Sequence, residues 1–132
     1  MNRNKIEELK RVRFSIEYEN MLASPTVKEI NPDCKCVKID GELSFTSAFG
    51  KSEKTIDKVL KPEDKAYFHS NCLNPDCTGF GFSLSSIIYS AIKERIVKEG
   101  VIRCEGKEDW KYYDNAGCSC MSYCKYLIEP LF

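Results

Sequence analysis

The sequence predicts an α+β domain in which one long amphipathic helix packs on a small antiparallel sheet. Residues 83–98 carry apolar side chains at helical spacing, whereas shorter segments before and after them have patterns typical of strands. This succession of elements places the helix against one face of the sheet. The chain has 132 residues, the length of one domain, and its 8 cysteines indicate that sulfur chemistry contributes to the fold.

The helix over residues 83–98 has the clearest periodicity in the chain. Ser83 is placed to cap its first turn, and Gly100 lies where a left-handed terminating residue is common. Glu94 and Lys98 form a favourable i, i+4 pair on the polar side. The apolar stripe that would face the core consists of Leu84, Ile87, Ile88, Ala91, Ile92 and Ile96.

The N-terminal part of the chain has no cysteine and a mixed pattern. Residues 3–12 have helical spacing, and residues 13–19 alternate between apolar and polar side chains as a strand does. Residues 20–33 contain two prolines and are expected to be mostly loop. We therefore expect a single domain, 1–132, made of a helix/strand arm, 1–33, and a cysteine-rich core, 34–132.

Several further elements are expected in the core. Asp40-Gly41 is a pair typical of tight hairpin turns, and alternating segments flank it. Ser52–Leu60 is predicted to be a short helix that ends before Pro62. Strands are predicted over residues 65–70, 101–104 and 123–128.

Charge and hydropathy exclude several classes of protein. The 20 basic and 20 acidic residues cancel and are spread evenly, so no basic stripe favours strong nonspecific binding to nucleic acid. The longest apolar run is far shorter than the roughly 18 residues that a membrane-spanning helix needs. The N-terminus is charged and lacks the apolar segment of a secretory signal. We therefore expect a cytoplasmic protein with reduced thiols and no membrane contact.

The cysteine spacing predicts a structural zinc ion. Cys72 and Cys77 bracket Leu-Asn-Pro-Asp, whose turn chemistry brings the two thiolates together as in a metal knuckle. Zinc takes four tetrahedral ligands, and thiolates suit it. Cys104 follows the long helix and is the expected third ligand. Cys120 is the expected fourth, although Cys118 and Cys124 are alternatives to it.

A second zinc site and other roles for the sulfurs stay open. Cysteines two apart in a strand point to the same face, so Cys-x-Cys pairs can aim two sulfurs at one point. The alternatives to a second site are buried thiols and disulfides, and His69 can replace one cysteine at the first site. A second four-sulfur site would use Cys34, Cys36, Cys118 and Cys124.

The stretch from Ala66 through Cys72, Cys77, Gly79 and Gly81 into the amphipathic helix resembles part of the zinc-binding, zinc-ribbon domain of bacterial DNA primases. The resemblance covers residues 66–92. It implies a zinc-ribbon-like fold, contact with single-stranded DNA, and Cys72 and Cys77 as metal ligands.

The aromatic cluster and the lack of a catalytic set favour a binding protein over an enzyme. Trp110, Tyr112 and Tyr113 lie close together in one segment, and such aromatic residues dominate protein interfaces. The alternative is that they cover the zinc site or the sheet. One histidine and no catalytic triad or paired-carboxylate spacing make a small zinc enzyme the third choice.

We therefore predict a zinc-stabilised protein-binding or regulatory module, an adaptor or inhibitor. The alternative is a nucleic-acid-binding zinc ribbon, which the basic residues within 3–13 would assist.

Overall fold

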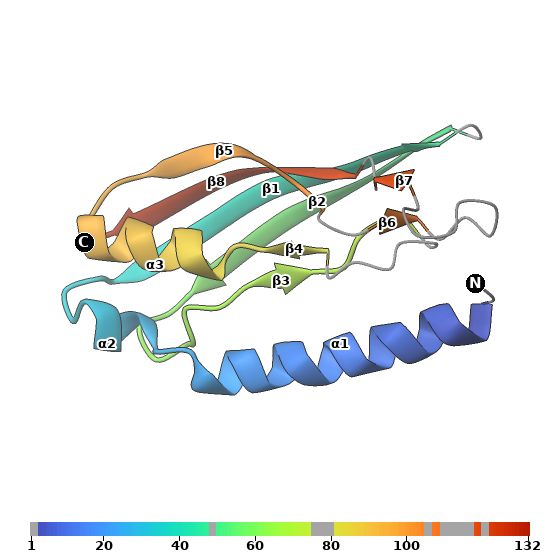
Figure 1. Ribbon diagram of the computed structural model, residues 1–132. Helices are drawn as coiled ribbons and strands as arrows, with labels where there is room; N and C mark the ends of the chain where they lie inside the picture. Colours follow the sequence, from blue (N-terminus) through green and yellow to red (C-terminus); the bar gives the residue numbers. More distant parts are fainter. Residues whose placement is uncertain (1–2, 48–49, 75–80, 105–106, 109–117, 120–121) are drawn as a thin grey trace.

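The computed structural model describes residues 3–47, 50–74, 81–104, 107–108, 118–119 and 122–132 (Figure 1). Its largest element is a four-stranded antiparallel sheet with the strand order β2-β1-β8-β5. These strands are β1 (Cys36–Ser47), β2 (Gly50–Leu60), β5 (Lys98–Arg103) and β8 (Tyr123–Leu131). Two short antiparallel pairs accompany the sheet: β3 (His69–Ser70) with β4 (Phe82–Ser83), and β6 (Lys107–Glu108) with β7 (Cys118–Ser119).

The helices lie on one side of the sheet. They are α1 (Arg3–Ala23), α2 (Val27–Ile30) and α3 (Ser85–Glu94). α3 and the β3–β4 pair cover the inner face of the sheet, and α1 runs along the outside of this layer (Figure 1). This arrangement confirms the predicted α+β class with a helix packed on an antiparallel sheet.

The core lies between α3 and the sheet. Along β1, the buried side chains Val37, Ile39 and Leu43 alternate with exposed residues, so one face of the strand is apolar. On β8, Ile128 pairs with Ile39, and Cys124 pairs with Leu43. Full burial of each large apolar side chain contributes roughly 1.5–3 kcal/mol. The helix side of the core supplies Val27, Phe82, Leu84, Ile88, Ala91 and Ile92.

The predicted hairpin turn at Asp40-Gly41 is wrong, because both residues lie inside β1. The β1–β2 ladder continues from Val37–Leu60 to Ser47–Gly50, so the two strands connect beyond Ser47. Gly41 serves close packing instead of a turn. A Cβ atom at this position would lie 2.9 Å from the Lys125 carbonyl oxygen and 3.3 Å from Ile56 Cδ1.

The predicted helix over Ser52–Leu60 is also wrong, because these residues form most of β2. Ile56 and Leu60 are its buried residues, and their spacing of four fits one side of a helix and one face of a strand equally well. These residues form a strand because they pair with β1 along the whole ladder. The predicted strands over 101–104 and 123–128 are confirmed within β5 and β8, whereas only His69–Ser70 of the predicted 65–70 strand is extended.

α3 is shorter than the predicted 83–98 helix, because it begins at Ser85 and ends at Glu94. Ser83 lies in β4, and the cap position is Leu84, which forms no side-chain cap. Arg95, instead of Gly100, takes the left-handed conformation that ends the helix, with φ 58° and ψ 42°. The β-branched residues Ile96 and Val97 lead from the helix into β5, which contains Gly100. The predicted Glu94–Lys98 ion pair is present at 2.8 Å and joins the helix end to β5.

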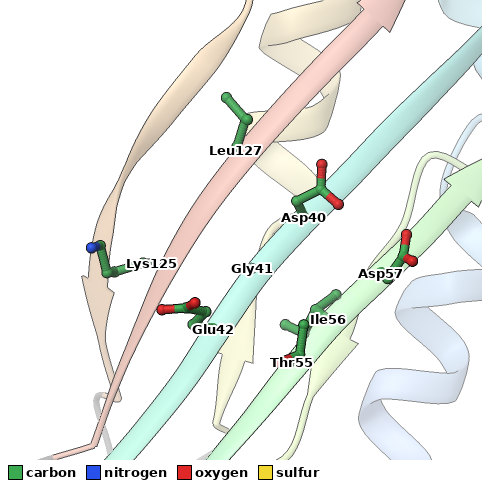
Figure 2. A pocket seen from close by; sticks show the side chains of 8 residues that line it. All are labelled: Asp40, Gly41, Glu42, Thr55, Ile56, Asp57, Lys125 and Leu127. Carbon is green, nitrogen blue, oxygen red and sulfur yellow. The ribbon is translucent and has the colours of Figure 1, made fainter.

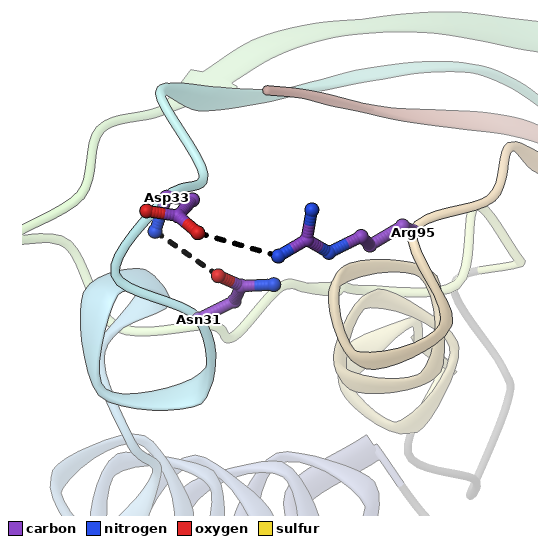
Figure 3. Close-up of polar contacts among 3 residues, drawn as sticks. All are labelled: Asn31, Asp33 and Arg95. Atoms are coloured by element: carbon purple, nitrogen blue, oxygen red, sulfur yellow. Dashed lines mark hydrogen bonds and ion pairs between the residues drawn. The ribbon is translucent and has the colours of Figure 1, made fainter.

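The contacts of Arg95 hold this unusual backbone position. Its guanidinium pairs with the Asp33 carboxylate at 3.3 Å, and the Asp33 N–H donates to Asn31 Oδ1 at 3.0 Å (Figure 3). The same guanidinium lies 4.9 Å from the centre of the Phe132 ring. The ends of α2, α3 and β8 therefore meet at one end of the sheet.

α1 extends through the segment that was predicted to become a strand at residues 13–19. No glycine or proline interrupts the chain before Pro25, so the helix continues until the residues preceding that proline. The alternating apolar residues then fall on different sides of the helix, and Phe14 and Tyr18 remain 73% and 54% exposed. In the described part of the chain, no helix is long and apolar enough to cross a membrane.

Candidate functional site

Cys72 lies two residues after β3, in the segment that runs away from the α2 end of the sheet (Figure 1). Its Sγ atom accepts a hydrogen bond from the Asn74 N–H at 3.4 Å, a contact that favours a thiolate. Gly81 precedes β4 with φ 81°, and a Cβ atom there would lie 2.3 Å from the Ser70 carbonyl oxygen and 2.8 Å from the Cys72 nitrogen. The chain next to Cys72 therefore requires glycine at position 81, which fixes the two segments against each other.

Cys104 lies where β5 ends, and hydrogen bonds tie it to the neighbouring strands. Its N–H donates to the Ser122 carbonyl at 3.1 Å, and the buried Ser122 hydroxyl donates to the Ser44 carbonyl at 3.2 Å. These bonds join the end of β5, the start of β8 and the middle of β1. Cys104 is buried, and Cys72 is partly buried against the same core. Two of the four predicted zinc ligands are therefore held by the sheet and its neighbouring hairpin.

The cysteines of the predicted second site are not brought together. Cys36 pairs with Leu131 at one end of the sheet, whereas Cys124 pairs with Leu43, seven residues further along β1. That separation is about 23 Å along an extended strand. Cys34 adjoins Cys36, because its thiol donates to the Cys36 carbonyl at 3.4 Å. Cys118 lies in β7, where its backbone pairs with Glu108.

Cys34 and Cys124 have the environment of core thiols. Both side chains are almost fully buried. Burial raises the pKa of the Cys124 thiol to about 11, and it also raises the pKa of Cys34. Protonated thiols behave as small apolar side chains, whereas metals bind the thiolate. These two residues fit the buried-thiol alternative that the sequence left open.

Five of the predicted site residues lie outside the described part of the chain: Cys77, Cys120, Trp110, Tyr112 and Tyr113. His69 pairs with Ser83 across the β3–β4 hairpin. Among the residues that the structure describes, no three His, Cys, Asp or Glu side chains converge on a metal position. A zinc centre of Cys72, Cys77, Cys104 and Cys120 therefore stays a prediction.

A second feature lies on the outer face of the sheet, the face turned away from α3. An open cleft of about 360 Å³ crosses β2, β1 and β8 there (Figure 2). The side chains of Asp40, Glu42 and Asp57 surround it, together with Thr55, Lys125 and Leu127. All three carboxylates are exposed. We call this feature the outer-face cleft.

The charges of the outer-face cleft are unbalanced. Asp40 and Asp57 lie directly opposite each other in the β1–β2 ladder, and Glu42 lies two residues along on the same face. Within the described chain, none of these three carboxylates takes part in a hydrogen bond or an ion pair. Lys125 lies directly opposite Glu42 in the β1–β8 ladder, and Lys51 interacts electrostatically with the same carboxylate, so the opposed pair Asp40 and Asp57 carries the unbalanced charge (Figure 2).

Sequence analysis missed this cleft for a specific reason. With Asp40 assigned to a turn and Asp57 to a helix, the two residues have no common surface. The alternation of Val37, Ile39 and Leu43 with charged residues is the signal that indicates a continuous strand through Asp40. The pairing partner of that strand, however, cannot be derived from this pattern alone.

No protein-family model matches the chain, and comparisons with curated proteins and with solved structures find no significant match.

Proposed function

We propose that this chain is a cytoplasmic, zinc-stabilised protein-binding module without catalytic activity, and that a partner docks on the outer-face cleft. The observation that carries the proposal is the opposed pair of exposed carboxylates Asp40 and Asp57, with Glu42 beside them, around an open cleft. Like charges directly opposite each other on two strands cost about 0.2–1 kcal/mol. A cationic group that enters the cleft removes this repulsion and gains attraction.

The chemistry of the cleft favours a protein partner with exposed lysine or arginine side chains. An arginine guanidinium can bond two carboxylate oxygens at once, and Asp40 and Asp57 present such oxygens side by side. The apolar side chain of Leu127 adds a surface for the methylene groups of a basic residue. Phosphate groups are repelled by the same carboxylates, so this face does not favour the nucleic-acid alternative.

Zinc is the second part of the proposal. The expected ligands are Cys72, Cys77, Cys104 and Cys120. Support comes from the packing of Cys72 and Cys104 against the same core, and from the N–H bond that Cys72 Sγ accepts from Asn74. The ion would join the segments that follow β3 and β5 and add its binding energy to that of the apolar core.

Site-specific photo-crosslinking in cells that express the full chain tests the docking surface. With p-benzoylphenylalanine in place of Thr55, at the cleft, we expect crosslinks to a protein partner. The same reagent in place of Glu63, exposed beyond β2, is the position control. The crosslinks should decrease strongly with Asp40→Asn and Asp57→Asn together, because the cationic side chain loses both acceptors. Glu8→Gln and Glu63→Gln together, an equal charge change at two exposed positions outside the cleft, should leave them unchanged.

The nucleic-acid alternative is tested with the purified chain and a labelled single-stranded DNA. The proposal predicts no binding by fluorescence anisotropy. Binding that weakens steeply with added salt would favour the nucleic-acid-binding zinc ribbon instead. Crosslinks that survive the double Asp→Asn substitution would show that the partner does not use the outer-face cleft.

A further inference from the structure

α1 has few contacts with the rest of the domain. The Tyr67 hydroxyl donates to the Glu17 carboxylate, and the Lys65 ammonium donates to the Ser24 carbonyl at 2.8 Å, just after the helix. Val12, Tyr18 and Leu22 are each 54% exposed. In proteins, most of the stability of a helix comes from packing of its apolar face. Among the side chains of α1 that the structure describes, however, most are exposed to solvent.

The charges of α1 oppose its own helix dipole. The first turn has no acidic residue and the last turn has no basic residue. Residues 3–13 contain 5 basic and 2 acidic residues, whereas residues 14–23 contain 2 acidic and no basic residues. Positive charge is unfavourable at the N-terminus of a helix, and negative charge is unfavourable at its C-terminus. A second helix that runs antiparallel compensates both ends.

The sequence of α1 is complementary to itself when reversed about Ser15. Arg11 and Glu19 lie four residues before and after this serine, and Val12 and Tyr18 lie three residues before and after it. Spacings of three and four place all five residues on one stripe of the helix. At 3.6 residues per turn, Ser15 points about 160° away from Glu17, which contacts the domain. The stripe therefore faces solvent.

We propose that a second copy of this chain packs on this stripe, with the two α1 helices antiparallel and crossing at Ser15. Arg11 of each copy then pairs with the partner subunit's Glu19, and Val12 packs against the partner subunit's Tyr18. The small Ser15 at the crossing allows the backbones to approach. Each contact occurs twice because the interface is two-fold symmetric. A parallel pair would instead place Arg11 beside Arg11 of the partner subunit.

This interface does not depend on the outer-face cleft or on zinc ligation, so it stands apart from the proposed function. α1 lies outside the helix and hairpin layer of the domain (Figure 1), whereas the cleft residues Asp40 and Glu42 lie on the face of the sheet turned away from that layer. A dimer formed through α1 therefore leaves both clefts open to partners. It presents two copies of the cleft, which raises the effective affinity for a partner with repeated basic segments.

Sedimentation velocity of the purified full chain over a concentration series tests the proposal. The unchanged chain should sediment with the mass of two chains. Arg11→Glu and Glu19→Arg should each weaken the dimer by at least about tenfold, because each converts two attractive pairs into two repulsive ones. An equimolar mixture of the two variants should form dimers again, since every contact across the mixed interface joins opposite charges. The double variant should also dimerise.

Glu63→Arg is the matched control, because it makes the same charge reversal in an exposed loop outside α1. It should leave the dimer intact. A monomeric unchanged chain, dimers that persist in both single variants, or a mixture that stays monomeric would each overturn the antiparallel arrangement. Far-UV circular dichroism of each variant separates lost folding from lost association, and a folded variant whose mixture dimerises supports the proposal.

Discussion

The two ends of the sheet are stabilised in different ways. At the end that contains Cys34, Arg95 and Phe132, helices and strands meet through buried apolar side chains and an ion pair. At the other end, Cys72 and Cys104 lie where β3 and β5 finish, and polar backbone contacts hold them. The comparison teaches that cysteine has two roles in one chain: Cys34 is a core thiol at one end, and at the other end the candidate metal ligand Cys104 lies near a second core thiol, Cys124.

Removal of zinc should have the largest effect and should act first on the Cys72 end. Structural zinc contributes on the order of 10–16 kcal/mol in small domains, and a whole domain has about 5–15 kcal/mol of stability. A strong chelator should therefore abolish most of the far-UV ellipticity, and Cys72→Ser should do the same without chelator. An unchanged melting temperature in strong chelator would contradict this expectation.

A cavity in the packed region should have the next largest effect. Ile128 is fully buried on β8 opposite Ile39. We expect Ile128→Ala to lower the free energy of unfolding by about 2–5 kcal/mol while zinc content stays the same. Urea denaturation with a parallel metal assay measures both quantities. Loss of zinc together with stability would show that the two ends are not independent.

The buried thiol of Cys124 should make stability depend on alkaline pH. Its pKa is about 11 in the folded chain, because burial raises it from 9.0, the value of an exposed thiol. The unfolded chain therefore releases this proton first, and stability is complete below pH 9 and falls as the pH rises toward 11. The loss is about 2–3 kcal/mol at most.

Urea denaturation at neutral and alkaline pH measures this decrease for the unchanged chain and for Cys124→Ala. The variant lacks the titrating group, so its stability should decrease less over the same range. Equal decreases in both chains would assign the pH dependence to other groups.

The smallest effect is expected at Arg95, which ends α3 in a left-handed conformation. Glycine adopts this conformation without the cost that a Cβ atom brings, about 1–2 kcal/mol. Arg95→Gly also removes the exposed ion pair with Asp33, which is worth about 0–1 kcal/mol. We expect a small net stabilisation in thermal denaturation. A large destabilisation would show that the Asp33 and Phe132 contacts matter more than the backbone strain.

The sequence predicted those parts of the fold that local periodicity determines. The apolar stripe from Leu84 to Ile92 indicated the helix that packs on the sheet, and the segments at residues 101–104 and 123–128 indicated two of its strands. Periodicity failed where one spacing fits two structures. Ile56 and Leu60 suit a helix or a strand, and only the pairing with β1 decides between them.

The candidate sites were predictable to different degrees. The sequence singled out Cys72 and Cys104 together with Cys77 and Cys120; the structure packs Cys72 and Cys104 against the core, and their ligation stays a prediction. Spacing could not separate core thiols from ligands, because the distance between Cys36 and Cys124 depends on the β1–β8 register. The outer-face cleft depends on the same kind of nonlocal pairing, here between Asp40 and Asp57.

Native mass spectrometry of the purified chain, before and after acid treatment, tests the central claim most directly. One zinc ion per chain is expected before acid and none after it. Cys72→Ser should abolish the bound metal, whereas Cys34→Ala at the other end should retain it. A metal-free native chain, or a Cys72→Ser variant that keeps its zinc, would contradict the assignment of metal ligation to this end of the sheet.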